Sequence, residues 1–375
     1  MPGIYRAEMP GSYTEEKNSK VKGCFMQDRH GAEFHNAEEL VEIVGWNVRN
    51  ALLGEVYATP KPGLVDRRDT GSHSDMSYET FLLSTEAITP YLAEMFEEGL
   101  RSGGNTENPE NVFLGIRKTG MEAEKAMYAA TGNVNTHKGM IFTMGILLAA
   151  AGLIAGEKLS RFSDAQQNDS CKSHERVKSR FFDIDRILET GRNMSYRILE
   201  KDFLEMAKRE PRSHGEKLFH KYGEKGIRGQ AMEGFPIIKE IGLPAMRKYL
   251  SIAGDTELRS EIAERATLRH RLLEDEGSMR DEHFENAVNI STLIAIMSDL
   301  NDTNVLTRSS YEDMEWLKGE SAEIVKIGAA FSEEGLSAIE ELNVKCIEKN
   351  ISPGGAADIL AVTILLLKLE GISYV

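Results

Sequence analysis

The sequence predicts an all-α protein: a single globular domain of ten or more helices, with functional polar loops at the helix termini. Three observations support this fold class. Only 10 of the 375 residues are proline, below the share of about 5 % that is usual in proteins. The long segments carry apolar residues at spacings of three and four, and no run shows the alternating, β-branched pattern of a strand. The 41 % apolar share is enough for one extensive core.

Composition excludes several classes of function. The chain carries 45 Lys and Arg against 60 Asp and Glu, for a net charge of −15. A field of this sign repels the phosphates of DNA and RNA, so we expect no nucleic-acid partner. Three scattered cysteines, Cys24, Cys171 and Cys346, argue against a disulfide framework or a zinc finger. Any bound phosphate must therefore be held locally, by a few cations, helix N-termini or a metal ion.

The location that we expect is cytoplasmic, because no N-terminal segment resembles a signal peptide. The longest apolar run, Met140–Ala155, has 16 residues, fewer than the 18 or so that a membrane span requires. We expect it to be a buried core helix, with no membrane contact.

The elements can be placed in order along the chain. Residues 1–35 lack periodicity and are predicted to form a poorly ordered arm, so the domain occupies residues 36–375. A polar loop is expected over 156–178 and a glycine-punctuated stretch over 211–236. Helices are predicted over residues 36–57, 77–98, 111–130, 138–155, 181–208, 237–253, 259–276, 281–300, 311–330, 332–348 and 356–370.

The first helix ends on an unusual residue. Glu55 continues the apolar stripe of Val44, Val48 and Ala51 at the next helical step, which directs a carboxylate inward. A buried charge is costly unless it is paired or metal-bound. Two interpretations stay open here: a functional buried carboxylate, or a helix-end Glu that frays outward.

A polar loop, residues 59–76, follows directly. Two prolines hold its first part extended, and the loop carries Lys61, His73 and Asp75 between two apolar helices. Asp75 could serve as the N-cap of the next helix, and so could Ser77.

A second polar cluster precedes the core helix. Thr136 is a plausible N-cap, which would place His137 and Lys138 at the positive end of a buried helix. Exposed N–H groups, the helix dipole and one ammonium together make an anion site, and this functional interpretation is favoured over an ordinary helix start.

Three further clusters lie near helix ends. His214 and Arg228 occur among glycines, which fits a phosphate or ribose contact and fits a tight turn almost equally well. Asp302, Asn304 and Arg308 follow an apolar helix. The run Ser352-Pro353-Gly354-Gly355 frees backbone N–H groups for an oxyanion before an apolar helix whose first turn contains Asp358, which either caps the dipole or binds a cation.

Together these motifs resemble the triphosphoribosyl-dephospho-CoA synthase family. The resemblance covers about residue 40 to the C-terminus, and its most specific strings are TPKPGLVD at 59–66 and NTHKG at 135–139. Small departures occur at Asp69, Asn133, Ser213 and Gln230. The arm over residues 1–35 matches no part of the pattern.

The resemblance implies a reaction. ATP and 3′-dephospho-CoA would give 2′-(5″-triphosphoribosyl)-3′-dephospho-CoA and adenine. This product is the precursor of the prosthetic group on the acyl-carrier protein of citrate lyase or malonate decarboxylase. A downstream transfer enzyme and that acyl-carrier protein are thus the implied partners.

Displacing adenine builds positive charge on the ribose ring, which calls for a carboxylate near the acceptor hydroxyl and a proton donor near the purine. The triphosphate calls for Mg²⁺ together with cations or helix N-termini. On this basis the catalytic candidates are Glu55, His73, Asp75 and His214; the phosphate-binding candidates are Lys61, His137, Lys138, Arg228, Asn304, Arg308, Ser352, Gly354 and Gly355; and the Mg²⁺ candidates are Asp75, Asp302 and Asp358.

Alternatives remain at this point. His73 and His214 could bind ribose hydroxyls in place of protonating the purine, and the division of the carboxylates between metal and base is open. Two other functions use the same residues: a Mg²⁺-dependent all-α hydrolase of N-ribosyl bonds, and a non-catalytic protein that binds nucleotide or CoA.

Overall fold

The computed structural model describes residues 32–103, 109–168, 180–254 and 279–374. These residues form thirteen α-helices, one π-helical segment, one 3₁₀-helix and two strands of two residues each. The predicted all-α class is therefore confirmed. The predicted helix over 259–276 lies outside the described residues.

The elements follow one another along the chain with short connections. They are β1 Glu33–Phe34, α2 Ala37–Tyr57, α3 Tyr78–Ser102, α4 Pro109–Ala130, α5 Lys138–Asn168, α6 Ile184–Met206, α7 His214–Tyr222, α8 Gly226–Glu233, η1 Ile237–Gly242, α9 Leu243–Gly254, α11 Met279–Met297, α12 Thr303–Arg308, α13 Tyr311–Lys326, η2 Ala329–Phe331, α14 Glu333–Glu348, α15 Gly354–Glu370 and β2 Ser373–Tyr374.

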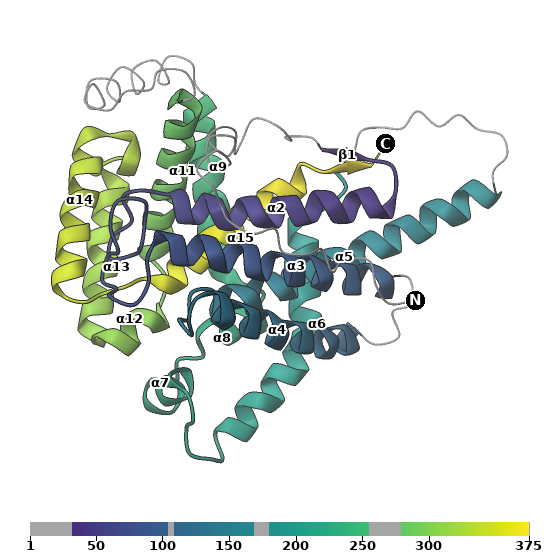
Figure 1. Cartoon of the computed structure of the whole chain (residues 1–375), viewed down its shortest axis with the longest axis horizontal. Coiled ribbons are helices and arrows are strands. Elements are labelled where there is room, and N and C mark those ends of the chain that lie inside the picture. Colours follow the sequence, from purple (N-terminus) through teal and green to yellow (C-terminus); the bar gives the residue numbers. More distant parts are fainter. Residues whose placement is uncertain (1–31, 104–108, 169–179, 255–278, 375) are drawn as a thin grey trace.

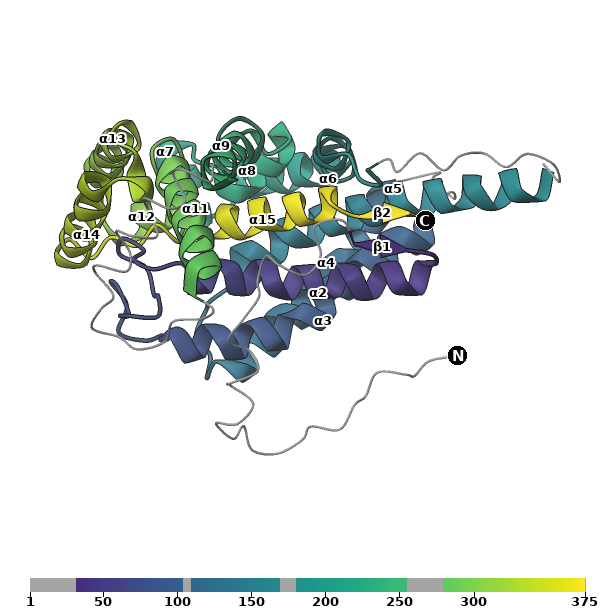
Figure 2. The ribbon, with the colours of Figure 1, turned by 90° about the horizontal axis from the view of Figure 1, so that it is seen from above.

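Helix α15 occupies the centre of the molecule. It contacts α2, α5, α6, α9 and α11 (Figures 1 and 2). Its sequence is apolar on every side, which is typical of a helix that is buried all round. Helices α12, α13 and α14 gather at its N-terminal end, and the short strands lie at its C-terminal end.

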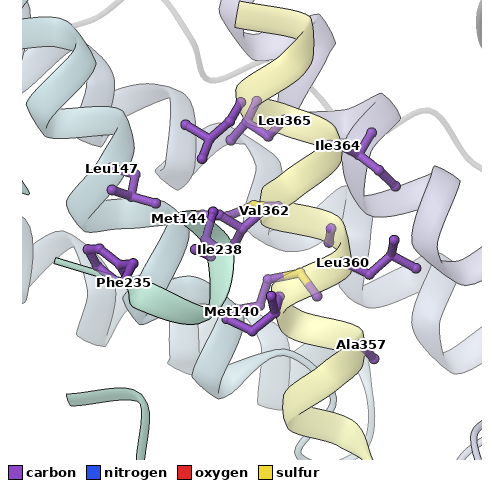
Figure 3. Packing of buried hydrophobic residues seen from close by; sticks show 14 of the residues in the cluster. Met140, Met144, Leu147, Phe235, Ile238, Ala357, Leu360, Val362, Ile364 and Leu365 are labelled. Atoms are coloured by element: carbon purple, nitrogen blue, oxygen red, sulfur yellow. The ribbon is translucent and has the colours of Figure 1, made fainter. Parts of the chain in front are cut away.

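The packing around α15 is continuous with the apolar N-terminal half of α5. Figure 3 shows Leu360 and Val362 of α15 beside Met140 and Met144 of α5, with Ile238 from the π-helical segment close by. All five side chains are at most 2 % exposed. Because α5 and α15 share this core, their N-termini are held in a fixed relation to each other.

The long apolar helix is buried, as predicted. The stretch Lys138–Phe162 is long and apolar enough to cross a membrane, but 89 % of its most apolar window lies inside the protein. Burial of this kind is expected of the core helix of a globular fold.

The structure differs from the predicted boundaries in three places. Helix α5 runs on to Asn168 in place of the polar loop predicted from residue 156. At the start of this extension Glu157 pairs with Arg186 of α6 at 2.5 Å. The stretch 211–236 forms α7 and α8. Residues 32–35 were predicted to be part of the arm but belong to the fold: β1 pairs in parallel with β2, and Phe34 is fully buried.

Candidate active site

A cleft of about 650 Å³ opens where the N-termini of α5, α12 and α15 face the turn between α7 and α8. Polar loops that are far apart in sequence therefore meet, which is what the sequence predicted for its helix-terminal clusters. The lining includes Gly139, Gly223, Glu224, Lys225, Gly226, Ile227, Gly229, Gln230, Glu233, Glu240, Asp299, Asn301, Asp302, Thr303, Asn304, Lys318, Gly355 and Asp358.

The cleft is strongly acidic. Six carboxylates line it against two ammonium groups, which belong to Lys225 and Lys318. Such a lining favours a developing positive charge and opposes a bare polyphosphate. A polyphosphate bound here would need a cation of its own.

Asp302 joins two of the helices that form the cleft. It is the N-cap of α12, where its Oδ1 accepts the N–H of Asn304 at 2.8 Å, and its Oδ2 accepts the N–H of Ala356 in α15 at 3.0 Å. Burial raises the pKa of this carboxyl, while the backbone N–H donors oppose that rise. Asp302 thus fixes α12 to the start of α15, and it also lines the cleft.

Asp358 projects from the first turn of α15 toward the start of α5. A Cβ at Gly139 would lie 2.3 Å from Asp358 Oδ2, so the absence of a side chain at Gly139 makes room for this carboxylate. Burial raises the pKa of Asp358 well above its usual value, and the nearby carboxylates of Glu55 and Asp302 raise it further.

Behind Asp358 lies a buried ion pair. Lys61 Nζ donates to Glu55 Oε1 at 2.5 Å and to the Glu55 carbonyl at 3.0 Å, and both side chains are 2 % exposed. The inward interpretation of Glu55 is therefore correct, and its partner is one of the predicted cations. Within the described chain, Glu55 Oε2 is buried without a hydrogen-bond partner.

His137 is fully buried beside this pair. Thr136 Oγ1 donates to Ser84 Oγ at 2.6 Å, and Ser84 Oγ lies 2.6 Å from His137 Nδ1. Ser84 therefore links Thr136 to Nδ1 of the imidazole, while Nε2 is buried without a hydrogen-bond partner among the described residues. Burial, helped by the charge of Lys61, lowers the pKa of His137 to about 3, so the ring is neutral.

The predicted anion site at the start of α5 is only partly realised. Thr136 is not the N-cap, since its hydroxyl is used by Ser84. Lys138 is exposed and pairs with Glu124 Oε2 at 2.8 Å. Of this cluster, Gly139 reaches the cleft lining.

A second cluster ties the loop 59–76 to the start of α15. His73 Nε2 lies 2.7 Å from Ser352 Oγ, and Arg308 donates to the Ser72 carbonyl and, at 2.7 Å, to Asn350 Oδ1. Burial and then the Arg308 charge lower the pKa of His73. These contacts hold the segment that leads into Gly354 and Gly355, so His73, Arg308 and Ser352 position the cleft from outside its lining.

The remaining candidates occupy different places. Ser77 is the N-cap of α3, and Asp75 is largely exposed, 3.6 Å from His73 Nδ1. His214 and Arg228 are exposed on α7 and α8. Asn304 lines the cleft beside Gly354.

The three Mg²⁺ candidates are divided. Asp302 and Asp358 line the cleft, whereas Asp75 lies with His73. In the described part of the chain, no three His, Cys, Asp or Glu side chains form a metal-binding group. Two carboxylates suit Mg²⁺ nonetheless, because this ion usually keeps several waters and takes its other ligands from substrate phosphates.

The sequence analysis missed one wall of the cleft. Lys318 Nζ donates to Asn301 Oδ1 at 2.9 Å, and Asn301 Nδ2 donates to Glu224 Oε1 at 3.2 Å. This chain of contacts joins α13 to the turn between α7 and α8. Lys318 stands at a polar position of an amphipathic helix, a pattern that does not distinguish a site residue from a solvated one.

Comparisons with known proteins identify the family of the chain. The sequence profile of the family described as ATP:dephospho-CoA triphosphoribosyl transferase matches residues 42–263 and 266–374. No solved structure matches the chain significantly.

Three relatives illustrate the similarity. The probable 2-(5″-triphosphoribosyl)-3′-dephosphocoenzyme-A synthase of Vibrio cholerae serotype O1 (strain M66-2) is 31 % identical over 330 residues, 88 % of this chain and 89 % of the relative. The synthase of the same name, without "probable", from Klebsiella pneumoniae is 31 % identical over 88 % of this chain and 90 % of its own. The probable synthase of Streptococcus equi subsp. equi (strain 4047) is 33 % identical over 85 % and 94 %. The chain thus belongs to the ATP:dephospho-CoA triphosphoribosyl transferase family.

Proposed function

We propose that this protein transfers the 5-triphosphoribosyl group of ATP to the 2′-hydroxyl of 3′-dephospho-CoA and releases adenine. The observation that carries the proposal is an acidic cleft, built from the helix termini that bear the family's motifs, in a chain that matches the family over nearly its whole length. The bond between the ribose anomeric carbon and adenine breaks, and a bond from that carbon to the acceptor oxygen forms.

The charge of the cleft supports this chemistry. Loss of the purine builds positive charge on the ribose ring, as glycoside cleavage does. Carboxylates placed before the reaction stabilise such a charge without further rearrangement. The cleft lining, with Asp358 at the start of α15, supplies this environment.

We assign the acceptor proton to Asp358. Its carboxylate borders the cleft and, among the described residues, makes no hydrogen bond or ion pair that would occupy it. Burial, and then the charges of Glu55 and Asp302, raises the pKa of Asp358, and the greater proton affinity suits a group that takes up the acceptor proton. Mg²⁺ bound with ATP would neutralise the triphosphate, and Asp302, which also lines the cleft, is the residue that would hold it.

The product would be consumed by a transfer enzyme that attaches it to an acyl-carrier protein of a lyase or decarboxylase. We place the protein in the cytoplasm, where its proposed substrate ATP is available.

Adenine release tests the proposal. The protein is mixed with ATP, Mg²⁺ and dephospho-CoA, and adenine and the mass of the CoA product are followed by chromatography and mass spectrometry. We expect adenine and the triphosphoribosyl adduct in equal amounts. Adenine without dephospho-CoA would show a hydrolase, and no adenine would refute the transfer.

Asp358→Asn tests the site. We expect kcat to fall by about a hundredfold or more, the usual contribution of a general base. Asp185→Asn, at an exposed position that pairs with Lys239, is the matched control and should retain activity.

A further inference from the structure

One segment of this acidic protein is basic. Residues 208–228, which we call the basic segment, contain seven Lys and Arg against three Glu, a net charge of +4 that leaves −19 for the remaining residues. The segment contains the residues that lead into α7, α7 itself, the turn after it and the first three residues of α8. In Figure 1, α7 lies at the outer edge of the molecule, below α12.

The cations of the basic segment are largely unpaired. Arg209 forms a two-point contact with Glu216 at 2.9 and 2.8 Å. The other six form no ion pair with any described residue, and all are exposed: Lys208, Arg212, Lys217, Lys221, Lys225 and Arg228. Two of them lie over aromatic rings: Lys221 Nζ is 4.5 Å from the ring centroid of Tyr222, and Lys225 Nζ is 5.6 Å from that of Phe203.

Several exposed lysines elsewhere on the described surface are paired. Lys138, Lys239 and Lys345 each pair with a carboxylate at 2.8–2.9 Å. A chain with 60 Asp and Glu offers many partners for ion pairs. The exposed cations of the basic segment that form no ion pair are available to an anionic ligand.

The basic segment is also one wall of the cleft. Lys225 lines the cleft directly, between Glu224 and Gly226. Lys221 lies four residues before Lys225, in the last turn of α7. Lys217 lies on the same face of that helix as Lys221, at the i, i+4 spacing. Lys217 and Lys221 lie outside the cleft lining and extend the positive charge of Lys225 along α7.

The two proposed substrates differ in what they require. Their reacting atoms must meet in the cleft, yet each carries phosphates, and the two sets repel each other unless they are held apart. The triphosphate of ATP, neutralised by Mg²⁺, suits the side of the cleft formed by Asp302, Asp358 and the N-termini of α5 and α15. The acceptor presents its 2′-hydroxyl, and its 5′-diphosphate and pantetheine arm must extend outward.

We propose that the basic segment binds the diphosphate of the acceptor dephospho-CoA, through Lys221 and Lys225 at the rim of the cleft. This inference rests on the proposed function. It assigns the donor and the acceptor to opposite walls of one cleft.

A charge-reversal variant tests the assignment. In Lys221→Glu/Lys225→Glu, we expect the Kd for dephospho-CoA, measured by calorimetry, to rise about tenfold or more, because two charge-assisted contacts are lost. The Kd for ATP with Mg²⁺ should stay within about twofold. The affinity of the wild type for dephospho-CoA should fall with added NaCl more steeply than that of the variant.

The matched control is Lys125→Glu/Lys326→Glu, which makes the same change of net charge on α4 and α13. We expect it to bind both substrates as the wild type does. Equal losses in the two variants would show only a general field effect and overturn the proposal, and so would weaker ATP binding with unchanged dephospho-CoA binding. Circular dichroism checks that both variants are folded.

Failure here is distinct from failure of the proposed function. A wild type that binds dephospho-CoA through Lys221 and Lys225 but forms no adduct would refute the transfer and support the binding site. A wild type that forms the adduct, with the variant unchanged in Kd, would refute the binding site alone.

Discussion

The two walls of the cleft are built in opposite ways. The inner wall, at Asp358, is backed by the buried ion pair of Glu55 with Lys61 and by the buried neutral imidazole of His137. The outer wall, formed by Glu224, Lys225, Asn301 and Lys318, is partly exposed and comes from a glycine-rich turn and one face of α13.

The difference separates two tasks. Long apolar helices, α5 and α15, hold the inner wall, so its charges are fixed before substrate arrives. Short helices with glycines between them carry the outer wall, where exposed side chains can adapt to a large ligand. Stability should therefore depend on the inner wall and substrate affinity on the outer one.

Replacing a lysine by methionine should change the free energy of unfolding most on the inner wall. Lys61→Met should lower the free energy of unfolding by about 3–5 kcal/mol, because Glu55 would remain buried without its partner. Urea unfolding measures the change. The double variant Glu55→Gln/Lys61→Met should recover part of the loss, and a Lys61→Met protein as stable as the wild type would contradict the dependence on this pair.

Gly139→Ala should affect activity more than stability. The new Cβ would meet the end of the Asp358 side chain, which can rotate away at little cost. Because a displacement of about 1 Å in an active site can cost about a hundredfold in rate, kcat should fall by one to two orders of magnitude (about 10- to 100-fold), with Tm nearly unchanged. Gly215→Ala is the control, since nothing lies within 4 Å of its added Cβ.

Lowering the pH should reduce the free energy of unfolding through the buried imidazole of His137. Unfolding restores an ordinary pKa of about 6.5, so the unfolded chain takes up a proton below this pH while the folded ring, with its pKa of about 3, stays neutral. Stability is complete above pH 6.5 and falls as pH drops, by about 2 kcal/mol from this group between pH 7 and 5. Unfolding curves of His137→Gln over this range should show a smaller loss than the wild type.

Lys318→Met on the outer wall should give the smallest change in stability. Its side chain is 22 % exposed, and partly exposed contacts of this kind contribute about 1 kcal/mol or less. If Lys318→Met proved as damaging to folding as Lys61→Met, the two walls would not differ in the way described.

The fold was largely predictable from the sequence because helical periodicity is a local signal. The apolar stripe of α2 and the apolar run of α5 both became buried helices, and the stripe correctly directed Glu55 inward. The predicted end of α5 was wrong because the helix continues into a polar stretch that lacks the apolar run on which the prediction rested. There Glu157 pairs with Arg186, a residue distant in sequence.

The sequence predicted which loops contribute to the site better than it predicted which residues line it. Asp302, Asn304, Gly355 and Asp358 were predicted and line the cleft. Lys225 and Lys318 were missed, since an exposed lysine acquires meaning only from what the fold brings next to it. The predicted roles of His214, Arg228 and Lys138 stay predictions, as these side chains are exposed away from the lining.

The pairing of β1 with β2 brings residue 33 beside residue 373, at the end of α15 remote from the cleft. Since 12 residues of α15 separate Asp358 from the end of the helix at Glu370, this junction is about 18 Å from Asp358 along the helix axis. The domain could thus be circularly permuted, with a short linker from Tyr374 to Ala32 and new termini cut in an outer loop. The rearranged gene would still encode an intact catalytic end.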